Sequence, residues 1–129
     1  MSNAPTVLLG FVPLARAIVR SAADATATTV TPDDSGTLFV NLSTSEHTYT
    51  LPTVTDCKGK HFIFFDGNST AGIVITGGTT DKIMALDDTG ADSITNGGTD
   101  ALVGDYVIVL GDGTYYYALV STGTWSAST

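Results

Sequence analysis

Two runs of β-branched and aromatic residues within 104–120 form the strongest hydrophobic pattern of the chain, and they flank Asp112 and Gly113. An Asp-Gly pair supplies the positive φ angles that a tight turn between antiparallel strands requires. The pattern therefore predicts a β-hairpin. A two-residue turn would place Leu110 opposite Tyr115 and would fix the register of the pairs that follow.

Side chains of a strand alternate between its faces, so the predicted hairpin has two defined sides. One side would carry Tyr106, Ile108, Leu110, Tyr115, Tyr117 and Leu119. The other side would carry Val107, Val109, Tyr116, Ala118 and Val120. Neither side is polar, whereas a hairpin at a protein surface normally has one side in water. We expect a second sheet, another chain or both to cover the hairpin, with the first six residues in the core or in an oligomer interface.

Further segments of similar character recur at intervals of about ten residues and are separated by turn signals, such as residues 32–36. They predict strands at 37–42, 47–51, 60–65 and 72–76, and less strongly at 17–19, 26–31 and 81–86. Residues 87–100 are predicted to be a long loop with at most a brief strand at 93–95, and residues 121–129 a polar tail. This pattern predicts an all-β fold, a small β-sandwich or β-barrel of short antiparallel strands.

The beginning of the chain is apolar but lacks a regular pattern. Pro5, Gly10 and Pro13 interrupt any element in residues 1–15. We expect residues 1–27 to be an extended N-terminal arm and residues 28–129 to be the β-domain. The arm either folds back onto its own domain or docks on a neighbouring subunit or another protein. Its predicted contact residues are Val7, Leu8, Leu9, Phe11, Val12, Leu14, Arg16 and Arg20.

Charge is unevenly distributed along the 129 residues, whose net charge is −8. Arg16 and Arg20 are the only charged side chains before residue 24, and all 13 acidic residues follow them. An acidic domain repels nucleic acid, so no nucleic-acid partner is expected. No apolar run reaches the length of a membrane helix, so we expect no membrane partner. Cys57 is the single cysteine, which excludes a disulfide within the chain.

The side chains that could carry chemistry form no recognisable set. Cys57, His47 and His61 lack the spacing of an activated nucleophile and its base. The acidic residues Asp87, Asp88 and Asp92 do not match the twelve-residue EF-hand loop, and a solvated loop explains them. We therefore expect no catalytic residues, no cofactor and no metal, and hence no enzymatic activity.

Several segments, in this order, resemble the small β-domains of tailed-phage capsid decoration (cement) proteins and of related tail-fibre modules. They are residues 31–39, 49–52, 59–62, 81–83, 104–107 and 112–117. The resemblance covers about residues 28–120. In many relatives the ring two places after Thr114 is tryptophan, whereas here it is Tyr116. The resemblance implies a homotrimer of small β-domains on a capsid, without enzymatic activity.

The expected function is therefore that of a virion structural protein. It would bind the major capsid protein on the outer surface of a phage head and stabilise the shell. The chain begins at Met1 and extends little beyond one domain, which favours a free-standing decoration protein over a fibre. The alternative is a tail-fibre or head-fibre domain that binds a receptor or glycan through its aromatic side chains.

Overall fold

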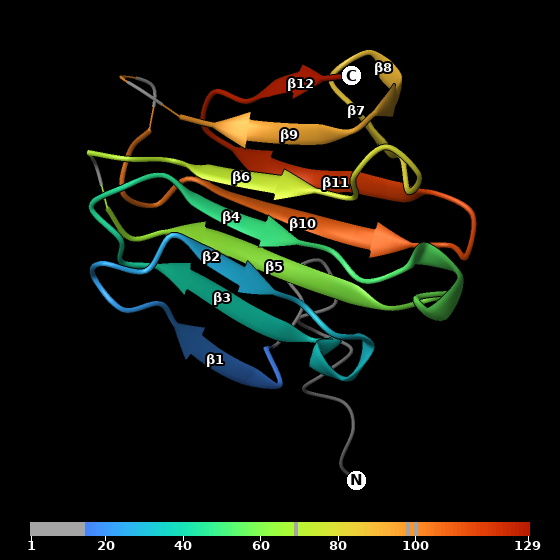
Figure 1. Ribbon diagram of the computed structural model, residues 1–129, viewed down its shortest axis with the longest axis horizontal. Helices are drawn as coiled ribbons and strands as arrows, with labels where there is room; N and C mark the ends of the chain where they lie inside the picture. Colours follow the sequence, from blue (N-terminus) through green and yellow to red (C-terminus); the bar gives the residue numbers. More distant parts are fainter. Residues whose placement is uncertain (1–14, 69, 98, 100) are drawn as a thin grey trace, which may run out of the picture.

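The computed structural model describes residues 15–129 except 69, 98 and 100, and these residues form a two-layer β-sandwich (Figure 1). The seven-stranded sheet has the order β1 (Ala17–Arg20), β3 (Thr37–Asn41), β5 (His61–Asp66), β10 (Tyr106–Gly111), β11 (Tyr116–Thr122), β7 (Ile83–Ala85) and β8 (Asp88–Ala91). The five-stranded sheet has the order β12 (Ser126–Ser128), β9 (Ser93–Asn96), β6 (Ile73–Thr76), β4 (His47–Thr50) and β2 (Ala27–Thr29). Two short 3-10 helices, Pro32–Asp34 and Val54–Asp56, connect strands. The predicted all-β sandwich is confirmed.

The first six strands alternate between the two sheets. β1, β3 and β5 belong to the larger sheet, and β2, β4 and β6 to the smaller one. Strands that are neighbours in a sheet are therefore two apart in sequence, and they run parallel. The predicted antiparallel pairing is found in the second half of the fold, where β10 pairs with β5 and β11, and β9 with β6 and β12.

The core lies between the two sheets and is built from the inward positions of the strands. Three of its rings lie close together: the Phe39 and Phe64 ring centroids are 5.5 Å apart, and Tyr49 lies 4.9 Å from Phe64. The central strand β10 contributes Val107 and Val109. Aromatic contacts of this kind add to the stabilisation that burial of apolar area provides.

The predicted hairpin is present, but its predicted register is wrong. Leu110 lies opposite Tyr117, and Gly111 opposite Tyr116, so residues 112–115 form the turn. The carboxylate of Asp112 explains the longer turn, because its Oδ1 accepts the N–H groups of Thr114 and Tyr115, both at 2.7 Å. The observed pairing is shifted by two residues from the predicted pairing. Side chains of a strand return to the same face every two residues, so the residues near the turn keep their predicted faces. A bulge follows, where the pairing shifts between Val109 and Ile108.

The weaker strand predictions at 17–19, 26–31 and 93–95 correspond to β1, β2 and β9. β1 therefore lies within the predicted arm, and the predicted domain boundary after residue 27 falls inside β2. β8 lies in the predicted loop at 87–100, and β12 occupies part of the predicted polar tail, where no strand was expected. The turn between β7 and β8 consists of Leu86 and Asp87, with φ of 56° and 66°. Hairpin turns of this kind usually contain glycine or asparagine, so no residue pattern indicated a turn at Leu86 and Asp87.

Candidate interaction surface

Alternation along the central strands decides which residues of the seven-stranded sheet face away from the core. Phe62 and Phe64 of β5 lie in the core, so Ile63 and Phe65 face outward. The ladders place eight such residues side by side on the outer side: Leu38, Val40, Ile63, Phe65, Tyr106, Ile108, Leu110 and Tyr117. We call this set the apolar face.

Two isoleucines form the centre of the apolar face. Ile63 lies opposite Ile108 in one ladder and opposite Leu38 in the other. Ile63 and Ile108 are 9% and 7% exposed, whereas the other six members are partly exposed. At the edge of the sheet Ile18, the partner of Leu38, is 60% exposed. The apolar surface therefore continues across the sheet from β1 to β11.

The outer side of the five-stranded sheet has the opposite character. Its ladders align two rows across the strands, Ala27, Thr48, Val74, Thr95 and Ser126 in one row and Thr29, Thr50, Thr76, Ser93 and Ser128 in the other. Eight of these ten residues carry a hydroxyl group, which water can hydrogen-bond. One outer side of the sandwich is thus suited to water, and the other is suited to contact with another apolar surface.

The structure divides the predicted interface residues between several places. Tyr106, Ile108, Leu110 and Tyr117 belong to the apolar face, whereas Tyr115 lies in the hairpin turn. Leu119 lies at the bulge of β11 and is 57% exposed.

Hydrogen bonds from the Tyr115 N–H, the Tyr117 hydroxyl and the Thr114 N–H lower the pKa of the Asp112 carboxyl at the hairpin end.

Four members of the apolar face were missed in the sequence: Leu38, Val40, Ile63 and Phe65. The signal was present in residues 61–66, where Phe62, Ile63, Phe64 and Phe65 follow one another without a polar residue. A strand that is apolar at every position needs cover on both of its sides.

The predicted arm contacts are only partly described. Val7, Leu8, Leu9, Phe11, Val12 and Leu14 lie outside the described residues. Arg16 donates a hydrogen bond from its guanidinium to the carbonyl oxygen of Asp33. Arg20 is exposed at the end of β1. Both cations therefore lie along the edge strand of the seven-stranded sheet.

The residues considered for chemistry are not brought together. Cys57 is fully buried in the core. The ring of His47 bonds to Ala25 O at 3.1 Å through Nδ1 and to Thr28 Oγ1 at 2.7 Å through Nε2, and burial lowers its pKa. Within residues 15–129, apart from the three that are not described, no group of three or more His, Cys, Asp or Glu side chains could hold a metal ion.

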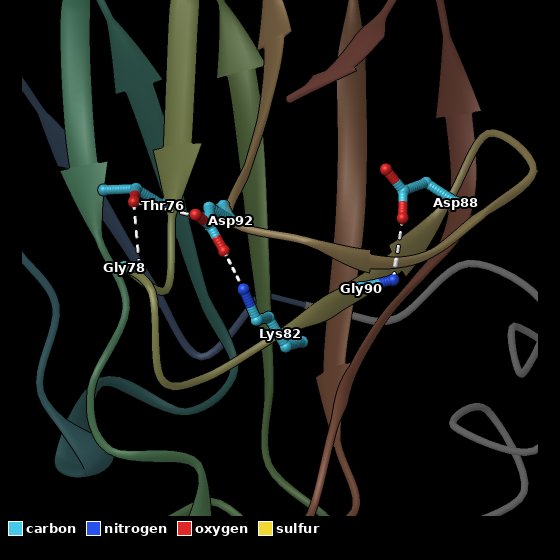
Figure 2. A network of polar contacts seen from close by, with 6 residues as sticks. All are labelled: Thr76, Gly78, Lys82, Asp88, Gly90 and Asp92. Atoms are coloured by element: carbon cyan, nitrogen blue, oxygen red, sulfur yellow. Dashed lines mark hydrogen bonds and ion pairs between the residues drawn. The ribbon is translucent and has the colours of Figure 1, made fainter. Parts of the chain in front are cut away.

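The acidic residues near the β7–β8 hairpin make separate contacts (Figure 2). Asp92 forms an ion pair with Lys82, while its carbonyl oxygen accepts the Thr76 hydroxyl at 3.2 Å. Asp88 Oδ1 instead accepts the N–H of Gly90 at 2.8 Å, within its own hairpin. These carboxylates hold loops together and do not converge on a common point.

A small cavity opens at the edge of the core beside β11. It has a volume of about 40 Å³, and its lining includes Ile94, Ala118 and Trp125. Ligand pockets of proteins are roughly 300–1,000 Å³, so this cavity is too small for a cofactor or a substrate of ordinary size.

No helix in the described part of the chain is long and apolar enough to cross a membrane. No protein-family model, curated protein or solved structure gives a match to this chain.

Proposed function

We propose that this chain is a non-enzymatic structural protein that self-associates through its apolar face and decorates the surface of a phage head. The observation that carries the proposal is the contrast between the two outer sides of the sandwich. One side is a double row dominated by serine and threonine, and the other is the apolar face. A large apolar patch on a folded domain marks a surface that contacts another protein.

Burial of the apolar face would contribute favourably to the free energy of association. Leaving a large apolar side chain exposed forgoes about 1.5–3 kcal/mol relative to burying it. Six of the eight members remain partly exposed, so covering them yields a substantial free energy of association. Copies with a net charge of −8 repel one another, and the apolar face bears no acidic residue that would add to this repulsion at the contact.

The number of copies and the identity of the partner come from the resemblance to decoration proteins. It suggests a homotrimer attached to the major capsid protein on the outer surface of the shell. The N-terminal residues up to Arg20 would provide the attachment, because they combine apolar side chains with the only two cations before residue 24. A basic segment on an acidic body meets an acidic surface without like-charge repulsion.

Self-association is tested by placing a charge on each outer side of the sandwich. Leu110→Lys alters the apolar face, and Thr50→Lys is the matched control on the hydroxyl-rich side. Light scattering at micromolar concentration should give an oligomer for the unaltered chain and for Thr50→Lys, and a smaller species for Leu110→Lys. A monomeric unaltered chain would refute the proposal.

Attachment is tested with a shortened chain that begins at Ala15. This variant keeps β1, which a cut at residue 21 would remove from the sheet. The shortened and the full chains are mixed with phage heads assembled without the protein, and bound protein is measured after sedimentation. We expect the shortened chain to be a folded oligomer that binds much more weakly. Undiminished binding would show that residues 1–14 are not needed and would assign the attachment to the remaining chain, which includes Arg16 and Arg20.

A further inference from the structure

One end of the sandwich core is polar instead of apolar. Asn41 and Asp66 are direct partners in the ladder of β3 and β5, and both are fully buried. The N–H of Asp66 donates to Asp105 O at 2.7 Å, so the next residue in this row is Asp105, which is 4% exposed. Two acidic residues therefore lie side by side across neighbouring strands, an arrangement that is unfavourable when both are ionised.

The carboxylate of Asp105 is well supplied with donors. Its Oδ2 accepts the N–H of Leu102 at 3.0 Å and the side-chain amide of Asn96 at 2.9 Å. The same Nδ2 of Asn96 donates to Thr124 O at 3.0 Å. Because both of these partners can only accept, the orientation of the Asn96 amide is fixed, and its Oδ1 must face elsewhere.

Donors and acceptors do not balance around Asp66. Its Oδ1 accepts the N–H of Asn68 at 3.0 Å, but its Oδ2 is buried without a hydrogen-bond partner among the described residues, as is Asn96 Oδ1. The Tyr49 hydroxyl is a buried donor that also lacks a partner in this part of the chain. A bond from this hydroxyl could satisfy only one of the two acceptors, and an unpaired buried acceptor is costly. A hydrogen on Asp66 Oδ2 would turn that oxygen from an acceptor into a donor.

We propose that Asp66 and Asp105 form a proton-binding site, in which Asp66 carries one proton and the Asp105 carboxyl accepts the hydrogen bonds of Leu102 and Asn96. The proton turns Asp66 Oδ2 from an acceptor into a donor and removes one of the two adjacent negative charges. The site joins the end of β5 to residues 102–105, because Gly104 N–H also donates to Asp66 O at 2.9 Å. Loss of the proton weakens this end of the sandwich.

The electrostatic surroundings agree with this assignment. Burial, supported by the charge of Asp105, raises the pKa of Asp66 to about 6, although the N–H of Asn68 and the side chain of its ladder partner Asn41 oppose the rise. Among the other titratable groups at this end, His47 and Tyr49 of β4 are buried, and Glu46, which lies near Gly97, is exposed. Burial, with the charge of Asp66 as a smaller cause, raises the pKa of Tyr49. Burial lowers the pKa of His47, so this ring is neutral at neutral pH.

The sign of the effect on stability follows from linkage. Between about pH 4 and pH 6 the folded protein holds a proton on Asp66 that the unfolded chain has released. In this interval, release of the Asp66 proton should lower the ratio of folded to unfolded protein by up to about tenfold for each unit by which the pH increases. Above pH 6 the contribution of Asp66 levels off.

The deciding experiment is a carbon-13 NMR titration of the Asp66 carboxyl in the full, unaltered chain. We expect a midpoint close to pH 6, together with faster amide exchange of Asn68 and Leu102 above it. Urea unfolding is then compared for Asp66→Asn and Asp87→Asn, where Asp87 is an exposed residue in the turn before β8. Asp66→Asn should lose the pH-dependent component, and Asp87→Asn should keep it.

Three outcomes would overturn the proposal. The first is an Asp66 carboxyl that titrates near its ordinary value of 3.8. The second is an unchanged pH dependence in Asp66→Asn. The third is a rise in melting temperature on addition of calcium chloride at neutral pH that Asp66→Asn abolishes, because a bound cation would then supply the positive charge. The titration needs no variant, so it remains decisive even if Asp66→Asn does not fold.

Discussion

The hydroxyl of Tyr116 donates a hydrogen bond to the carbonyl oxygen of Pro52 at 2.6 Å, across 64 positions of sequence. Tyr116 is fully buried, and burial raises the pKa of its hydroxyl. The bond ties the start of β11 to the segment that follows β4, so it connects the two sheets at one end of the core.

Replacement of Tyr116 by phenylalanine should lower the free energy of unfolding by about 1–3 kcal/mol, because the carbonyl oxygen of Pro52 would be left buried without a donor. Urea unfolding followed by circular dichroism measures the loss. Tyr117→Phe is the matched control, since the Tyr117 hydroxyl bonds to Asp112 at the exposed hairpin end. An equal loss of free energy of unfolding in both variants would show that the burial of the Tyr116–Pro52 hydrogen bond does not determine its contribution.

Gly72 directly precedes β6 and lies close to the backbone at the end of β9. A Cβ atom at this position would lie 1.6 Å from the backbone oxygen of Asn96, and neither backbone can move without breaking the ladder. Gly72→Ala should therefore destabilise the protein by about 3 kcal/mol or more. A Cβ at Gly90 would meet nothing within 4 Å, so Gly90→Ala should be tolerated. Thermal unfolding of both variants tests the contrast, and a stable Gly72→Ala would show that the ladder can shift.

Leu86 occupies a left-handed conformation with φ of 56°, and 49% of it is exposed. A non-glycine residue in this region carries roughly 1–2 kcal/mol of strain, which asparagine tolerates better than leucine. Leu86→Asn should raise the free energy of unfolding by up to about 1 kcal/mol. Leu102, which is 60% exposed and has no positive φ, provides the control: Leu102→Asn should give no gain.

His47 should make the protein less stable in acid. Its folded pKa lies below the ordinary value of 6.5 because of burial, so the unfolded chain takes up a proton first as the pH falls. Stability from His47 is therefore present above pH 6.5 and is lost below it, opposite in sign to the effect of Asp66. When the pH is lowered from 6 to 4, the Asp66 contribution increases the free energy of unfolding, and the His47 contribution decreases it. His47→Gln lacks the second contribution, so its free energy of unfolding should increase more than that of the unaltered chain. A smaller increase, measured by urea unfolding, would contradict this assignment.

The sequence by itself determined the elements that depend on neighbouring residues. The apolar runs around Asp112 and Gly113 were sufficient to predict the hairpin, and the recurring short strands were sufficient for the all-β fold. The division of the hairpin into two apolar sides was also correct near the turn, because alternation is a local property of a strand. Sequence did not show which side is the core, since both are equally apolar.

Only the tertiary structure decided the features that depend on distant partners. The register of the hairpin was set by the Asp112 carboxylate, and the parallel pairing of β3 with β5 was set by the passage of the chain through the other sheet. Ile63 and Ile108 are adjacent on the apolar face although 45 positions separate them, and Asp66 and Asp105 are adjacent in the core although 39 positions separate them. Such pairs arise because the arrangement of strands in a sheet is fixed by how the whole chain buries its apolar surface, which no local pattern of residues specifies.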